Sequence, residues 1–296
     1  MAFDVSGLSD YVKQNPELSG RVVSSAKTVE QLKGFKSLVF GKGKMDLASI
    51  DQTIVFGSGA NCGRPVGGDI SFDQRTIEYT KLTEFTTLCY DVLYNTFMAE
   101  KISQGQNEQK LDAEVFGQIV SDRLDLIAGE HDKLMWQGNV TGGTGNMNKY
   151  NGFIHVIKTD GTILTASGSD IIAKLQSVVN QIPIDLRSHP DFRIFIGKDV
   201  EDAINLKLYN DNRFHPAQSG IVPGTSVAYL VNPGLNGTNE VVPIRGTNLR
   251  VILDHEDDAT TMKAVVDPKT DETNLDVRFG SGVQITIADE AYIATV

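Results

Sequence analysis

Apolar residues recur every three or four positions between Asp112 and Gln137, and polar residues mostly separate them. Eight apolar residues and one histidine form the stripe: Val115, Phe116, Ile119, Val120, Leu124, Ile127, His131, Leu134 and Met135. The spacing predicts an amphipathic helix roughly 39 Å long. We expect Asp112 to cap its start, Gly138 to end it in the left-handed conformation, and Gly129 to be simply tolerated.

This helix is not stable by itself. Fixing its backbone costs roughly 26–52 kcal/mol. Burying eight apolar side chains contributes roughly 12–24 kcal/mol, as an upper bound. The apolar stripe therefore requires a sheet or other helices packed along it.

The last 50 residues contain short β-like runs, NLRVILD, TMKAVVD, NLDVRFG and GVQITIADEAYIATV. Val283, Ile285 and Ile287 alternate with polar residues, and turns are predicted at 273–276 and 280–282. These strands are the expected cover for the stripe of the long helix.

Residues 159–246 have a different texture and predict a compact α/β unit. A helix capped by Ser169, a strand at 193–197 and a helix capped by Asp199 follow one another. The loop at 210–226 is long enough to be functional or interfacial. We therefore expect an α/β unit inserted between the long helix and its sheet.

The segment from Ile50 to Phe85 predicts a two-stranded ribbon around a glycine-rich tip, because Ile70, Phe72 and Ile77 alternate with polar residues. A lone hairpin is marginal in water, so the ribbon requires a partner surface.

Three further elements are predicted near these segments. Thr28–Gln31 has a capping-box pattern that opens a short helix toward Phe40. We also expect a helix over 87–103 and a strand over 151–158. The leading pieces cannot form a core, which favours an arm that lies on something else.

The composition is that of an ordinary soluble protein, with 40% hydrophobic and 22% charged residues. No apolar run spans a membrane and no secretory signal is visible. The net charge of −11 is uneven, because residues 1–44 carry +3 and the remainder −14. An acidic body does not suit a protein that grips nucleic acid through its phosphates.

The sequence offers few candidates for catalysis, and no catalytic, cofactor-binding or metal-ligating set is predicted. The five histidines lie in separate segments, and His131 is expected to be a hydrogen-bonded, semi-buried side chain. Cys62, among glycines and beside Arg64, is the one candidate thiol nucleophile, with no histidine near it in the sequence. Cys89 lies on an apolar face and is expected to be packed.

Two loops have alternative readings. GNVTGGTGN after the long helix resembles a phosphate-binding loop only superficially, since it lacks GK[ST] and follows a helix, so a flexible linker is favoured. The acidic run at 254–258 has oxygen ligands for calcium, but an exposed turn is favoured.

The ordered features resemble one family, the major capsid proteins of tailed double-stranded DNA bacteriophages with the HK97-type fold, and more narrowly those of crAss-like phages of Bacteroidetes hosts. The resemblance rests on short motifs in order along nearly the whole chain: LSDYVKQN, AKTVEQL, VFGSGANCGRPVGGDISFDQRTIEY, TLCYDVL, EHDKLMWQGN, YNGFIHVI and SGVQITIADEAYI.

The resemblance implies an α+β fold with a long spine helix packed on a β-sheet, an inserted α/β A-domain, an extended E-loop ribbon and an N-terminal arm. The implied division is an arm at 1–49, an E-loop at 50–85, a P-domain at 86–158 with its spine helix at 112–137, an A-domain at 159–253, and P-domain return strands at 254–296. Lys81 matches the residue type of the ribbon lysine that cross-links in some members, but no cross-link is predicted.

The implied function is a structural, non-enzymatic subunit that self-assembles into pentamers and hexamers of an icosahedral head enclosing double-stranded DNA. Implied partners are further copies of the chain, a separate scaffolding protein, a portal and possible decoration proteins, with no membrane and no sequence-specific DNA binding. The implied location is the virion, after assembly in the bacterial host cytoplasm. Two alternatives stay open: an encapsulin-like compartment shell and a thiol enzyme centred on Cys62.

Overall fold

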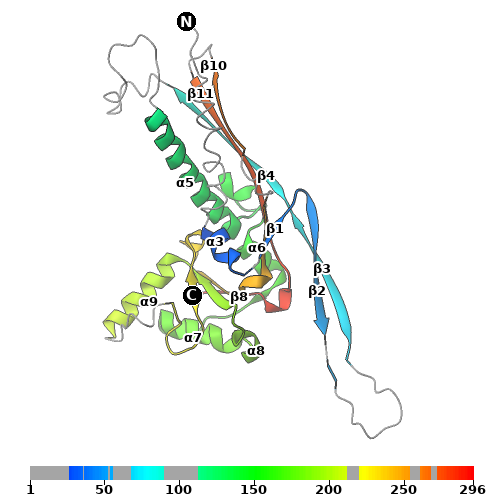
Figure 1. Ribbon diagram of the computed structural model, residues 1–296. Coiled ribbons are helices and arrows are strands. Elements are labelled where there is room, and N and C mark those ends of the chain that lie inside the picture. The colour runs from blue at the N-terminus through cyan, green and yellow to red at the C-terminus, as the bar shows by residue number, and fades with distance from the viewer. Residues whose placement is uncertain are drawn as a thin grey trace.

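The computed structural model describes the chain in eight stretches: residues 27–35, 37–52, 54–55, 68–89, 113–211, 220–253, 261–267 and 272–296. Within them the protein combines helices with two five-stranded sheets and a separate two-stranded ribbon, which confirms the α+β class. Figure 1 shows a body from which two long β structures leave in different directions.

The central element is α5, Ala113–Gln137, which closely matches the predicted helix. Its inward side chains are buried where the stripe predicts burial, namely Val120, Leu124, Ile127, Leu134 and Met135. Gly129 is tolerated, because no atom lies within 4 Å of the position of a Cβ. Gly138 does not have the positive φ that was predicted. It is needed for close packing instead, since a Cβ there would overlap the carbonyl of Tyr150.

The first sheet has five strands: β1 Leu38–Phe40, β4 Thr80–Cys89, β9 Leu249–Leu253, β10 Thr261–Asp267 and β11 Glu272–Ile285. β11 pairs antiparallel with β4, β10 and β9, and β1 lies parallel to β9. Leu275, Val277 and Phe279 of β11 share one core with the stripe of α5. The C-terminal strands therefore cover the long helix, as predicted.

The two predicted turns, 273–276 and 280–282, both lie inside β11, so these turn predictions are wrong. The glycines allow close approach of another segment. A Cβ on Gly280 would overlap the ring of Tyr79, and a Cβ on Gly282 would overlap the main-chain oxygen of Glu78. Glycine within a strand often marks such an approach, and here the chain crosses β11 as it passes from β3 to β4.

The second sheet has the order β5-β12-β8-β6-β7. Its strands are β5 Thr162–Ile163, β6 Phe192–Ile196, β7 Tyr229–Val231, β8 Glu240–Arg245 and β12 Tyr292–Thr295. Its helices are α7 Ile171–Gln181, α8 Ile184–Arg187 and α9 Lys198–Asn210. These elements enclose a second core. The last strand, β12, pairs with β5 and β8. This corrects the expectation that all the C-terminal strands belong to the sheet that covers the long helix.

The predicted helices of this unit are present, but their N-caps differ. Asp170, rather than Ser169, caps α7 by accepting the N–H of Ala173 at 2.9 Å. Gly197, rather than Asp199, occupies the N-cap position of α9.

The predicted strand at 151–158 is a helix, α6 Phe153–Asp160. Phe153 and Ile157 are both fully buried. Their separation by four residues places them on one helical face against α5. A run of eight residues is too short for periodicity to separate the two structures.

The predicted helix over 87–103 is wrong at its start, because residues 87–89 belong to β4. Residues 90–112 lie outside the described residues, and so does the predicted cap Asp112. The leading helix is α3, Lys27–Lys33, and the chain then enters β1. The apolar residues after α3 extend the first sheet rather than the helix.

Candidate functional site: a projecting β-ribbon and its root

A two-stranded ribbon is formed by β2, Lys44–Gln52, and β3, Ile70–Glu78. The strands pair antiparallel with each other, and in the described part of the chain neither has another ladder partner. Figure 1 shows the ribbon running away from the body. The predicted ribbon is thus confirmed, but its paired part spans 44–78 rather than 50–85. The residues from Thr80 onward belong to the first sheet.

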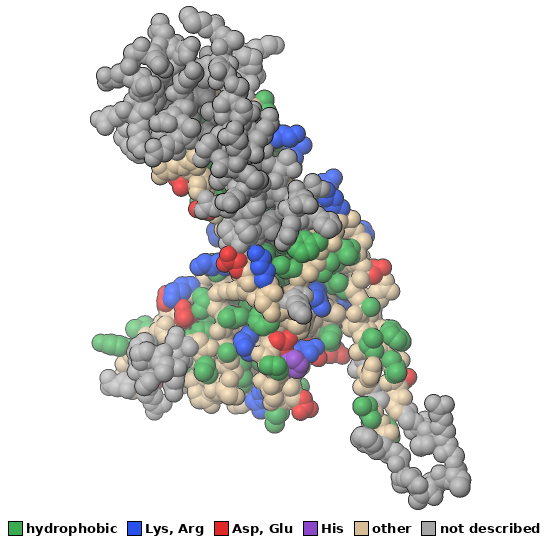
Figure 2. Space-filling model, in the orientation of Figure 1, with side chains coloured by type: hydrophobic (Ala, Val, Ile, Leu, Met, Phe, Trp, Pro, Cys, Tyr) green, Lys and Arg blue, Asp and Glu red, His purple; other side chains and the backbone are tan. Residues whose placement is uncertain are grey.

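The outer half of the ribbon has an uncovered apolar face. Residues directly opposite in an antiparallel pair share a face, and Ile50 pairs with Phe72 while Gln52 pairs with Ile70. The side chains of Ile50, Ile70 and Phe72, named here the distal apolar face, are 56%, 58% and 75% exposed. Figure 2 shows apolar side chains gathered on this part of the ribbon. No described residue of the same chain covers them.

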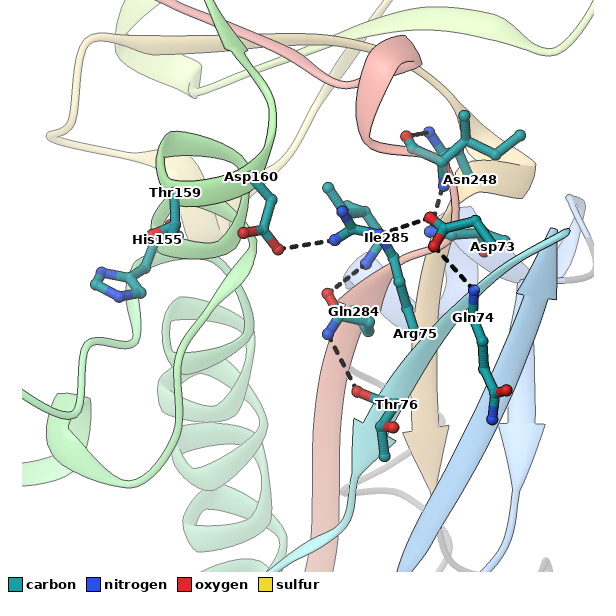
Figure 3. Close-up of polar contacts among 12 residues, drawn as sticks. Asp73, Gln74, Arg75, Thr76, His155, Thr159, Asp160, Asn248, Gln284 and Ile285 are labelled. Carbon is teal, nitrogen blue, oxygen red and sulfur yellow. Dashed lines mark hydrogen bonds and ion pairs between the residues drawn. The ribbon is translucent and has the colours of Figure 1, made fainter. Parts of the chain in front are cut away.

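The inner half of the ribbon is attached to the body. Ile77 is fully buried, whereas the rest of β3 is largely exposed. Arg75 donates from Nη1 to Oδ2 of Asp160, at the end of α6, at 2.7 Å (Figure 3). Gln284 of β11 donates from Nε2 to the carbonyl of Thr76 at 3.1 Å. The direction in which the ribbon leaves the body is therefore set by the residues at its inner end, Arg75, Thr76 and Ile77, named here the root.

The N-terminal side of the body is held by buried polar contacts between α3 and α5. The hydroxyl of Thr28 donates to Oδ1 of Asp132, and its main-chain N–H donates to the same oxygen at 3.0 Å. Trp136 Nε1 and Asn232 Nδ2 each donate to the Thr28 hydroxyl oxygen at 2.8 Å. Thr28 therefore lies inside α3 and does not cap it, which corrects the capping-box prediction.

The sequence pattern placed Asp132 on the wrong face of α5. It is expected among the outward polar residues of α5, yet it is only 3% exposed. Burial raises the pKa of its carboxyl group, and the two bonds from Thr28 oppose that rise. No periodicity signal marks it, because its partner is 104 residues away.

The candidates for catalysis are not brought together. His131 is fully buried, and in the part of the chain that the structure describes neither ring nitrogen has a hydrogen-bond partner, so the prediction of a hydrogen-bonded, semi-buried residue is wrong. Burial lowers the pKa of His131 to about 4. His189 pairs with Asp191 at a separate place. Cys62 and the acidic run at 254–258 lie outside the described residues.

The loop after α5 is ordered by its own hydrogen bonds. Asn139 Oδ1 accepts the N–H groups of Thr141 at 3.0 Å and Gly142 at 2.9 Å. The main-chain oxygen of Asn139 accepts the N–H of Gly143 at 2.8 Å. This corrects the prediction of a flexible linker, and it also leaves these N–H groups unavailable to a phosphate.

The described residues contain no group of three or more His, Cys, Asp or Glu side chains placed to hold a metal ion. None of the described helices has the length and apolar composition needed to cross a membrane.

No family model and no curated protein matches the sequence. Solved structures do match. The capsid of Myoviridae phage XM1 is 14% identical, with a TM-score of 0.55 over 89% of this chain and 91% of that chain. The capsid of an empty GTA particle is 12% identical, with a TM-score of 0.58 over 89% and 88%. The satellite phage P4 procapsid is 11% identical, with a TM-score of 0.53 over 91% and 96%.

The likeness extends over nearly the whole of each chain, so it concerns the complete arrangement of elements. The HK97-type fold expected from the sequence is thereby confirmed. The narrower resemblance to crAss-like phages stays a prediction.

Proposed function

We propose that this chain is the major capsid subunit of a tailed bacteriophage and that copies of it assemble into pentamers and hexamers of an icosahedral head. The proposal proceeds from a fold shared with phage and GTA capsid chains. It assigns the chain a structural role rather than a catalytic one. The enclosed genome is double-stranded DNA, held without sequence-specific contacts.

The observation that carries the proposal is the distal apolar face of the ribbon. Fully burying one large apolar side chain contributes about 1.5–3 kcal/mol. Since Ile50, Ile70 and Phe72 are 56–75% exposed, covering all three would contribute roughly 3–6 kcal/mol per ribbon. A monomeric protein gains nothing from such a projection, whereas a shell subunit gains this energy at every copy.

We propose the same division of the chain that the resemblance implies. Residues 1–49 form an N-terminal arm, 50–85 an E-loop, 86–158 a P-domain, 159–253 an A-domain and 254–296 the P-domain return strands. Support comes from the projecting ribbon, the long helix α5 against the first sheet, and the separate core of the second sheet. Three strands qualify this division. β2 begins the ribbon at Lys44, β4 already belongs to the first sheet from Thr80, and β12 joins the second sheet.

The charge distribution supports a container for DNA. The net charge is −11. Acidic walls repel the phosphate backbone and prevent the packed genome from adhering. We further propose a scaffolding protein, a portal and decoration proteins as partners, assembly in the host cytoplasm, and a final location in the virion.

The test is assembly of the full-length chain, expressed alone and with the scaffolding protein of its own genome, followed by sedimentation and electron microscopy. We expect capsomers or closed shells. Phe72→Asp should leave folded, unassembled subunits, because it places a charge in the contact. The matched control Ile184→Asp changes a side chain that is 66% exposed on α8.

A wild-type chain that stays monomeric at high concentration with the scaffold present would refute the proposal. Shells that purify with protein cargo and without DNA would favour the encapsulin-like alternative.

A further inference from the structure

A groove with a volume of about 380 Å³ lies between α5 and the first sheet. Its apolar wall includes Leu82 of β4, Phe279 of β11, and Ile127 and Leu134 of α5. Leu126, which is 63% exposed, stands at its edge. This volume falls within the range of small-molecule pockets, which combine apolar walls with a few polar groups that orient the ligand.

One end of the groove holds an imidazole. His131 lines the groove, is only 2% exposed, and meets the ring of Phe279 edge-on, with centroids 5.2 Å apart. Neither of its ring nitrogens is hydrogen-bonded to a described residue. Burial lowers the pKa of His131 to about 4, so the ring is neutral at pH 7 and offers one donor and one acceptor. A buried polar group without a partner destabilises the folded chain and calls for an explanation.

The other end of the groove holds a second set of polar atoms. Nη2 of Arg123 on α5 donates to Oε1 of Glu84 on β4. Nε of Arg123 and Oε2 of Glu84 are also buried, and neither has a hydrogen-bond partner among the described residues. A single hydroxyl group can satisfy both atoms, because it accepts from Nε and donates to Oε2. The opposite charges of the pair compensate each other, so this end favours an uncharged ligand group.

The two ends lie on one face of α5. Arg123 and His131 are eight residues apart, which places them roughly 12 Å apart along the helix axis. Ile127 lies midway, four residues from each, and therefore on the same face. A molecule that fills the groove must consequently be apolar along its middle and polar at both ends.

We propose that this groove, named here the α5–β4 groove, is a binding site for an elongated, uncharged molecule with an apolar body and a hydroxyl group at each end. One hydroxyl group binds a ring nitrogen of His131. The other binds Nε of Arg123 and Oε2 of Glu84. Every lining residue belongs to one chain, so the site exists in the unassembled subunit and the inference does not depend on the proposed function.

The experiment is isothermal titration calorimetry of the full-length, unassembled chain at pH 7 with two probes. The first is 4,4′-biphenol, two linked aromatic rings with a hydroxyl group at each end, and the second is 4-phenylphenol, which lacks one of these groups. The wild-type chain should bind 4-phenylphenol about two- to tenfold more weakly, because one hydrogen bond is lost.

The variant is His131→Leu, which removes the polar atoms of one end. It should bind the two probes with affinities within about twofold of each other, because the second hydroxyl group has lost its partner. The matched control His155→Gln changes a partly exposed histidine on α6 and should keep the wild-type ratio. Hydrogen exchange of the wild-type chain with 4,4′-biphenol should show added protection at 81–84 and 123–134.

A wild-type chain that does not bind 4,4′-biphenol overturns the proposal. Equal affinities of the wild-type chain for the two probes also overturn it, because they mean that water serves the polar ends. An unchanged ratio in His131→Leu overturns the role of His131. If that variant does not fold, hydrogen exchange of the wild-type chain decides, since protection outside both ranges places the probe elsewhere and overturns the site.

Discussion

His131 provides the most quantitative prediction, because its imidazole is buried and no described residue hydrogen-bonds to it. The change is His131→Leu, which removes the two ring nitrogens and keeps an apolar side chain against Phe279. The control is His155→Gln, which changes a partly exposed histidine on α6. We expect the variant to lose much of the sensitivity of the wild-type chain to mild acid.

The sign follows from the pKa of His131, which burial lowers from 6.5 to about 4. Between these values the unfolded chain binds a proton that the folded chain does not, so the free energy of unfolding falls as the pH falls. The part of the free energy of unfolding that depends on the protonation of His131 is fully present above pH 6.5 and lost below pH 4. The full loss is about 3 kcal/mol, and about 2 kcal/mol of it has occurred at pH 5.

The assay is urea denaturation of unassembled full-length chain at pH 7 and pH 5, followed by circular dichroism. The wild-type chain should lose about 2 kcal/mol more than His131→Leu between these two values. At pH 7 the variant should be more stable by about 1–3 kcal/mol, since leucine places no buried nitrogen without a partner at position 131. Asp132 changes stability in the opposite direction, because burial raises its pKa, and it is present in both chains.

Equal pH dependence of the wild-type chain and His131→Leu would refute this reasoning. It would mean that the imidazole gains a partner or reaches water in solution. His155→Gln should follow the wild-type curve.

Three further predictions concern the root, the crossing and the α3 contact. Gly282→Ala should destabilise the chain by about 1–3 kcal/mol in urea denaturation, because its Cβ overlaps the main chain that crosses β11. The control is Gly129→Ala, in open space on α5, which should stabilise the chain by up to about 1 kcal/mol. Equal effects of the two variants would contradict the close approach at Gly282. Arg75→Ala should lower the free energy of unfolding by at most about 1 kcal/mol, since its ion pair is partly exposed. It should nevertheless lower the yield of assembled particles, measured by sedimentation. An unchanged yield would argue against a role of Arg75 in fixing the direction of the ribbon. Thr28→Val should cost about 1–3 kcal/mol by removing a donor to buried Asp132, and a loss below 0.5 kcal/mol would show that water replaces it.

The sequence alone determined the elements whose pattern repeats over many residues. The stripe of α5 extends over seven turns, so the helix and its buried face follow from spacing. The alternation of β3 likewise predicted the ribbon, and the need of both elements for a partner surface followed from the entropy of ordering them. Short runs were less certain: α6 was predicted as a strand because eight residues support either period.

Only the tertiary structure decided what each element meets. Gly280 and Gly282 signal a turn in any local reading, but they lie within a strand because Tyr79 and its neighbours pass over them. Asp132 is placed inward by Thr28, more than a hundred residues away. His131 packs against Phe279 of β11 and has no hydrogen bond to any described residue. Periodicity records which face of an element is apolar, whereas close approaches and buried polar pairs depend on segments distant in the sequence.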